Sequence, residues 1–298
     1  MSAPDAITLL RSLCTAEGGF GLWTFDLWIT APLALSAVLY ASGTVRLWRH
    51  AGIGRGIGGW QAGCYGAGWL VLFAALVSPI HRWGEGLFAI HMIEHELVMA
   101  VAAPLIVLAR PGGAVAWALP AASRHRLAIA LRRLGLRSAW RTATRPLLAT
   151  VAHGVAIWAW HAPPLFEAAV VNVALHRLQH VSFLVTGLLF WWSLVRRRNA
   201  GVAAAHLLAT MLHTSILGAL IALAPRVIYP LQTGGAAAWG LTPIEDQQLA
   251  GLLMWIPAGT VYAGAALFCV AQWVRRSDAS SVITPAVEMS GTYREAAE

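Results

Sequence analysis

The sequence is dominated by apolar stretches that are long enough to cross the hydrocarbon core of a bilayer. We expect seven such spans, at about residues 27–46, 60–78, 87–109, 146–161, 172–195, 203–224 and 246–274. Backbone hydrogen bonds inside lipid must be satisfied within each segment, so spans of this kind are helices. Charged residues make up only 11% of the chain and the mean hydropathy is +0.64, which excludes a soluble globular domain. The sequence predicts an all-α, polytopic membrane protein with seven transmembrane helices.

The arginines give this bundle an orientation. Lysine is absent, and 17 of the 21 arginines fall in the loops after the first, third and fifth expected spans or in the C-terminal tail. Because arginine-rich loops stay in the cytoplasm, we expect the N-terminus outside and the C-terminus in the cytoplasm. The net charge of +8 therefore reflects topology and contact with anionic lipid, and it does not indicate a nucleic-acid partner.

The pattern divides the chain into three regions. They are an external N-terminal segment (1–26), the seven-helix transmembrane domain (27–274) and a polar cytoplasmic tail (275–298) that we expect to be disordered. The only long cytoplasmic connection, 110–145, contains an amphipathic segment with a leucine stripe opposite a row of arginines. We expect this segment to lie flat on the inner leaflet.

The third expected span carries four groups that hydrocarbon tolerates poorly: His91, Glu94, His95 and Glu96. At 100° per residue, His91, His95 and Met99 fall on one stripe of the helix, with Glu94 beside it. Imidazole and thioether groups aligned in this way suit copper better than calcium or magnesium. The three cysteines show no paired spacing, so histidines must carry any metal chemistry.

Other histidines are expected at matching depths in the neighbouring spans. The fifth span has a second pair with the same spacing, His176 and His180, and the fourth span ends at His161, whereas His81 falls in the outer loop before the third span. We therefore expect an outward-facing polar cavity between the helices. The predicted metal ligands are His91, His95, Met99, His153, His161, His176, His180 and His213, with Met254 at the depth of the lower ones.

Some of these residues have a structural alternative. A single intramembrane histidine, such as His153 or His213, also serves as a hydrogen-bonding contact between helices. Three acidic residues are expected to orient ligands rather than to bind metal: Glu94, Glu245 and Asp246. Glu245 also completes a capping-box pattern with Thr242, which would make its role structural.

Three segments, in this order, resemble the caa3-type cytochrome c oxidase assembly factor family. They are HMIEHELVMAVAAPLIVLARP (91–111), MLHTSILGALIALAPRVIYP (211–230) and EDQQLAGLLMWIPAGTVYAGAALF (245–268). The resemblance covers about residues 25–275 and implies a seven-span protein of the bacterial inner membrane. Such proteins help to mature a haem-copper oxidase, which is usually understood as delivery of copper to its catalytic subunit. Matched motif to motif, the family's functional positions fall on His91, His95, His213 and the segment Glu245–Gln248.

The working hypothesis is a non-enzymatic copper chaperone. Cu(I) would be held by imidazole and thioether ligands in the outer cavity and passed to the cytochrome c oxidase catalytic subunit, with periplasmic copper carriers as donors. Two alternatives stay open: paired histidines on facing helices could ligate haem, as in a cytochrome-b-like protein, or the protein could be a metal-free membrane scaffold for oxidase subunits. The sequence contains no nucleophile elbow, phosphate loop or dinucleotide fingerprint, so we expect no enzymatic activity.

Overall fold

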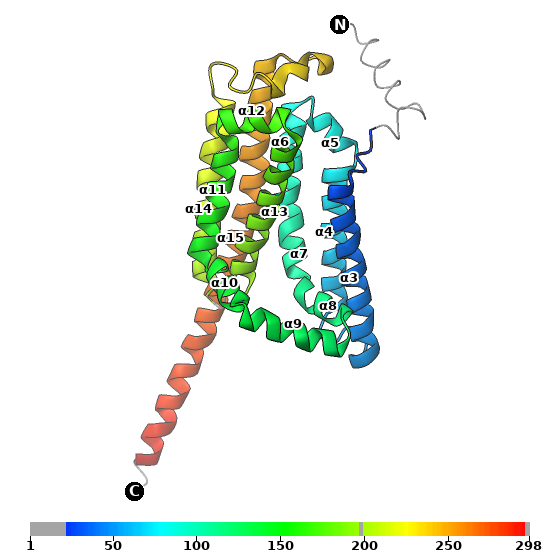
Figure 1. The fold of residues 1–298 in the computed structure, drawn as a ribbon. Helices are drawn as coiled ribbons and strands as arrows, with labels where there is room; N and C mark the ends of the chain where they lie inside the picture. Colours follow the sequence, from blue (N-terminus) through cyan, green and yellow to red (C-terminus); the bar gives the residue numbers. More distant parts are fainter. Residues whose placement is uncertain (1–21, 197–198, 296–298) are drawn as a thin grey trace.

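The computed structural model describes residues 22–196 and 199–295, with side chains up to residue 276, and every regular element in these ranges is helical (Figure 1). Six of these helices are long and apolar enough to cross a membrane, so the chain is a multi-pass membrane protein. They are α3 (Leu27–Ala51), α4 (Gly59–Val77), the continuous segment Phe88–Leu108, α13 (Val173–Val195), α14 (Ala200–Ala222) and the part of α15 (Pro243–Glu295) up to Arg276. Their ends lie close to those expected from the apolar pattern.

The helix for the fourth expected span is present but short. α11 (Pro146–His161) has 16 residues and packs against α13 and α14 within the bundle (Figure 1). A regular helix of this length rises about 24 Å, less than the hydrocarbon core of a typical bilayer. Six candidate spans are therefore shown among the described residues, and membrane crossing by α11 stays a prediction.

The third span changes its helical form in the middle. α6 (Phe88–Glu96) passes into a π-helix, η1 (Leu97–Ala102), and then into α7 (Ala103–Leu108). Pro104 in the first turn of α7 has no backbone N–H to donate to the carbonyl of Ala100, which favours a wider turn at this point. Because a π-helical turn holds more residues than an α-helical turn, side chains beyond η1 are rotated relative to those of α6.

Short helices cover both ends of the bundle (Figure 1). At one end lie α5 (Pro79–Gly84), α12 (Pro163–Val171) and the 3-10 helix η2 (Gln232–Trp239). At the other end lie α8 (Pro111–Ala118), α9 (Ala121–Arg133) and α10 (Leu136–Ala143), which form the expected long connection. α5, α8 and α12 each begin with proline, which costs no hydrogen bond at a first helical position. α9 crosses the end of the bundle from α8 to α10, and its contact with the inner leaflet stays a prediction.

The two ends of the chain were expected to be an external segment (1–26) and a disordered cytoplasmic tail (275–298). Residues 1–21 of the expected external segment lie outside the described residues. α15 continues as a helix to Glu295, and its final part projects away from the bundle (Figure 1). The expected disorder of this tail stays a prediction.

α14 and α15 approach each other closely at two glycines. A Cβ atom at Gly251 would lie 2.4 Å from the backbone nitrogen of Ala222 and 2.7 Å from the carbonyl oxygen of Gly218. A Cβ atom at Gly218 would lie 2.9 Å from the carbonyl oxygen of Gly251. Small residues that let backbones approach are a main source of helix association in lipid, where the hydrophobic effect between helices is absent.

We predict that Gly251→Ala destabilises the protein, because the added methyl group meets backbone that can only yield if α14 and α15 separate. Overpacking of this kind costs about 1–3 kcal/mol. Gly264→Ala is the matched control on the same helix, since a Cβ atom there meets nothing within 4 Å. The measurement is the unfolding midpoint of both variants in detergent micelles, and equal midpoints for the two would contradict the close approach.

Candidate metal centre

Six imidazoles converge near one end of the bundle. His81 lies on α5, His91 and His95 lie on α6, His161 is the last residue of α11, and His176 and His180 lie on α13. Neighbouring ring centroids lie 4.3 Å apart for His91 and His95, 4.6 Å for His176 and His180, and 5.2 Å for His95 and His180. The rings come from four helices, and they bring together five of the predicted ligands with His81, which was not among them.

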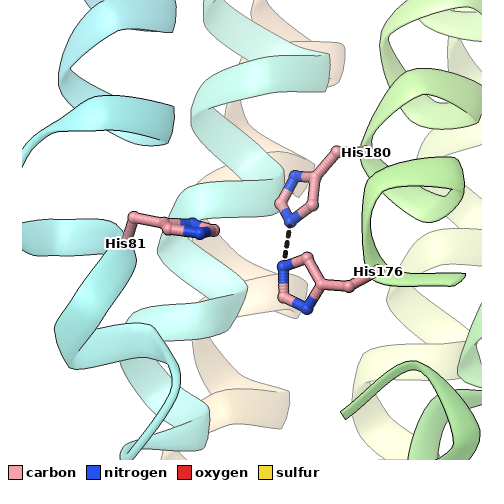
Figure 2. A group of neighbouring side chains, drawn as sticks. All are labelled: His81, His176 and His180. Atoms are coloured by element: carbon pink, nitrogen blue, oxygen red, sulfur yellow. Dashed lines mark hydrogen bonds between the residues drawn. The ribbon is translucent and has the colours of Figure 1, made fainter. Parts of the chain in front are cut away.

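The tightest group joins α5 to α13. Potential ligand atoms of His81, His176 and His180 all lie within 4.8 Å of one another. Figure 2 shows the three rings directed toward a common point, with a hydrogen bond of 2.7 Å between the Nε2 atoms of His176 and His180. Three imidazoles at such separations could hold one metal ion with modest side-chain adjustment.

Glu94 lies beside His81 and His180 of this group and is fully buried, with 0% of its surface exposed. Nδ1 of His81 and Oε1 of Glu94 are 2.7 Å apart, and Nε2 of His180 lies 3.5 Å from the same oxygen. Burial alone would lower the pKa of His81, but the hydrogen bond and charge of Glu94 outweigh burial and raise it above its usual value. An imidazole whose second nitrogen is held by a carboxylate is the usual arrangement of a metal-bound histidine. Glu94 is therefore placed where it could orient His81, and its expected role of orienting a metal ligand stays a prediction.

Several ring nitrogens in the cluster are buried without a hydrogen-bond partner among the described residues. They are both nitrogens of His91, both nitrogens of His95, Nε2 of His161 and Nδ1 of His180. An unpaired buried polar atom is costly, and native structures contain few of them. So many in one place fit a ligand that accepts the free lone pairs, and a metal ion is such a ligand.

A family model described as cytochrome c oxidase caa3 assembly factor matches residues 38–276, about four-fifths of the chain. The chain belongs to this family. The relatives found include uncharacterised proteins of Mycobacterium bovis and Mycobacterium tuberculosis, each 27% identical over 272 residues, and one of Mycobacterium leprae, 25% identical over 278 residues. These matches cover 86% of this chain but only 40% of each relative. No solved structure was found to match.

In this family member, the helix that carries His91 and His95 is positioned by Asp246 at the start of α15. Its carboxylate accepts hydrogen bonds from the backbone N–H groups of Phe88 (2.8 Å) and Ala89 (2.9 Å), which begin α6. The N-cap residue of α6 is Leu87, which offers no side-chain acceptor. Asp246 thus supplies from another helix the cap that the local sequence lacks.

Three further contacts tie the surrounding elements to the cluster. The side-chain amide of Gln232 in η2 donates to the carbonyl of Gly84 at 2.7 Å, and the Tyr229 hydroxyl donates to the carbonyl of His161 at 2.6 Å. Gly84 itself allows α5 to approach α6, since a Cβ atom there would lie 3.3 Å from Cα of His91.

The deeper predicted ligands lie outside the cluster. Met99 is buried within η1, past the point where the regular helical stripe of His91 and His95 ends. His153 hydrogen-bonds Thr186 on α13 at 3.0 Å. His213 accepts a hydrogen bond from Trp158 on α11 at 3.4 Å and lines an apolar groove there. These two histidines make the interhelical contacts that were their structural alternative, and a ligand role for Met99, His153 or His213 stays a prediction.

The two predicted orienting residues of α15 differ in role. Glu245 is exposed, and its carboxylate accepts hydrogen bonds from the backbone N–H (2.8 Å) and the hydroxyl (2.7 Å) of Thr242. The backbone N–H of Glu245 in turn donates to the Thr242 hydroxyl at 3.3 Å, which completes the capping box. Only Asp246 reaches the helix that carries the cluster.

The sequence pattern did not indicate His81 as a site residue, because the segment around it has no hydrophobic period and was expected to be a loop. Ser78 accepts a hydrogen bond from the backbone N–H of Ile80, and Pro79 follows as the first residue of α5. The Ser-Pro pair was therefore an available signal for a short helix that turns His81 toward the bundle.

We predict that Asp246→Ala lowers the stability of the protein by about 2 kcal/mol, because two charge-assisted hydrogen bonds to the start of α6 are lost. Asp246→Asn keeps one carbonyl oxygen as an acceptor and should lose about half as much. Glu245→Ala removes only an exposed cap and serves as the neighbouring control. Thermal unfolding in detergent measures all three, and an Asp246→Ala midpoint no lower than that of Glu245→Ala would argue against this role.

Proposed function

We propose that this member of the oxidase assembly family binds Cu(I) at the outer side of a bacterial inner membrane and delivers it to the catalytic subunit of a haem-copper oxidase. The observation that carries the proposal is the buried cluster of six imidazoles with unpaired ring nitrogens. In this role the protein catalyses no reaction, and copper is its cargo.

The donor set favours Cu(I) over the common hard cations. Neutral nitrogen ligands suit copper and zinc, whereas calcium and magnesium require several oxygen ligands. Glu94 is the one carboxylate bonded to the cluster among the described residues, and when it is ionised and His81 is neutral, as a metal ligand must be, it gives the pocket one negative charge. A monovalent cation matches that charge, and a divalent zinc ion would leave an uncompensated charge in a low-dielectric site.

The proposed topology places the cluster on the outer side. With α11 as a seventh, short span, the N-terminus faces outward and the C-terminus faces the cytoplasm, as the arginine distribution predicts. α5, α12 and η2 then cover the outer end, and the arginine-rich connection of α8, α9 and α10 faces the cytoplasm. Copper would reach the cluster without crossing the membrane.

The packing disfavours the haem alternative. Two axial imidazoles must lie on opposite faces of a flat macrocycle. Here the rings contact one another and phenylalanine: His95 lies 4.8 Å from Phe183 and His91 lies 5.4 Å from Phe166 between ring centroids. A porphyrin would have to separate helices that are packed through these rings.

We predict that replacing four cluster histidines together with alanine (His91, His95, His176 and His180) abolishes Cu(I) binding by the detergent-purified protein. Glu94→Gln should weaken binding on the order of 10–100-fold, because the orienting carboxylate of His81 is lost. His125→Ala is the matched control, since His125 is exposed on α9. Titration against a chromophoric Cu(I) chelator, with zinc as competitor and a parallel absorbance scan for a haem Soret band, gives the measurement.

The same variants separate copper delivery from a metal-free scaffold. In cells that lack the wild-type gene, the four-histidine variant should leave oxidase activity as low as in the deletion, and His125→Ala should restore it. Normal oxidase activity with the four-histidine variant would favour the scaffold and refute copper delivery, provided that both variants reach equal levels in the membrane.

We predict that a cysteine at Ala238 is labelled by a membrane-impermeant maleimide in intact spheroplasts, whereas a cysteine at Ser138 is labelled only after permeabilisation. Both positions are exposed, in η2 and α10 respectively. The background replaces Cys14, Cys64 and Cys269 with serine. Labelling of the Ser138 position in intact spheroplasts would overturn the proposed orientation.

A further inference from the structure

The six histidines divide into two groups by their hydrogen bonding. The outer group comprises His81, His176 and His180, which is bonded internally and to Glu94. The inner group comprises His91, His95 and His161. No ring nitrogen of the inner group hydrogen-bonds another imidazole of the cluster among the described residues, and five of its six ring nitrogens lack any partner.

The inner group is the more deeply buried one. His91, His95 and His161 are exposed by only 2%, 1% and 3%, whereas His176 in the outer group is partly exposed. His95 is the centre of the inner group, with its ring centroid 4.3 Å from that of His91 and 6.0 Å from that of His161. Phe166 lies beside His91 and His161, and Phe183 lies beside His95 and His161.

The hydrogen bond of His161 fixes which of its nitrogens can bind a cation. Nδ1 lies 2.7 Å from the carbonyl oxygen of Ile157, and a carbonyl can only accept, so Nδ1 carries the proton. Nε2 then carries a lone pair, and it is buried and unpaired. A backbone carbonyl in this position is a common means of orienting a metal-bound imidazole. His161 is therefore held in a form suited to bind metal.

We propose that the cluster contains two Cu(I) subsites: an outer one formed by His81, His176 and His180, and an inner one formed by His91, His95 and His161, whose ligand atoms are farther apart than the 4.8 Å of the outer group and would close on the ion. This inference depends on the proposed copper function and extends it. His180 and His176 connect the subsites, because the ring of His180 lies 5.2 Å from that of His95 and the ring of His176 lies 5.4 Å from that of His91. Copper moves between them by exchange of imidazole ligands, with no change of oxidation state and no additional reactant.

The position of Glu94 gives the two subsites different affinities. Its carboxylate lies against His81 and within 3.5 Å of His180, both in the outer group. One monovalent ion in the outer subsite is matched by this charge, and a second ion nearby is repelled by the first. The two ions therefore bind in sequence, the second more weakly. The exposure of His176 makes the outer subsite the route to the inner one.

The test is the Cu(I) stoichiometry of the full-length, detergent-purified chain, measured by chelator competition and by elemental analysis after desalting. Wild type and the His125→Ala control should bind two Cu(I) per chain in two steps. The outer double variant His81→Ala/His176→Ala and the inner double variant His91→Ala/His95→Ala should each bind one. Leucine replacements at His91 and His95 repeat the inner variant with better packing, and circular dichroism verifies the fold of every variant.

The outcomes distinguish this inference from the copper function itself. One Cu(I) per chain in wild type, lost in both double variants, means a single shared site and overturns the two subsites while leaving copper binding intact. No Cu(I) in correctly folded wild type overturns both. X-ray absorption of the loaded protein should show only nitrogen neighbours of copper, and a sulfur neighbour would assign Met99 to the site and refute the inner subsite as drawn.

The order of loading provides an independent measurement. In rapid mixing with excess Cu(I) chelate, Cu(I) should load the remaining inner subsite of the outer double variant at least tenfold more slowly than it loads the two subsites of wild type. The inner double variant should fill at the wild-type initial rate. Equal rates for the two double variants would refute the route through His176.

Discussion

The hydrogen bonds from Phe88 and Ala89 to Asp246 fix the start of α6, and the remainder of the site depends on that start. His91 and His95 follow within two turns, so their depth is set by the point at which the helix begins. The cap comes from α15, which belongs to the other end of the sequence. The first turn of the last span therefore positions the histidines of the third span, and neither helix defines the site alone.

If the cluster had only a structural role, its unpaired buried ring nitrogens would carry a large free-energy cost. A membrane bundle needs few polar contacts to associate, and His153 and His213 show how one hydrogen bond between two helices meets that need. The cluster differs because His91 and His95 have no partner on either ring nitrogen among the described residues, whereas His153 and His213 each have a partner on one. Polar groups kept unpaired in a low-dielectric interior are typical of a site that receives a ligand.

The sequence was sufficient for features that depend on local pattern. Apolar length predicted the six candidate spans, and the four-residue spacing predicted that His91 and His95, and likewise His176 and His180, share a face. It was insufficient where distant segments meet or the helix is irregular. The π-helix η1 interrupts the stripe before Met99, and His81 enters the site from a six-residue helix that has no hydrophobic period to detect. The contact of Asp246 with α6 joins residues about 157 positions apart, and a single sequence does not reveal it.

The charge of the pocket explains how one site could both hold and release its cargo. Glu94 is the one carboxylate bonded to the cluster among the described residues, and its hydrogen bond to His81 competes with no ligand atom because Nε2 of His81 is left free. In the proposed function, one bound Cu(I) would make the pocket neutral, which suits a buried site. A second Cu(I) makes it cationic, and this excess charge raises the free energy of the loaded state. Release of one ion to a partner would then be favoured from the doubly loaded protein.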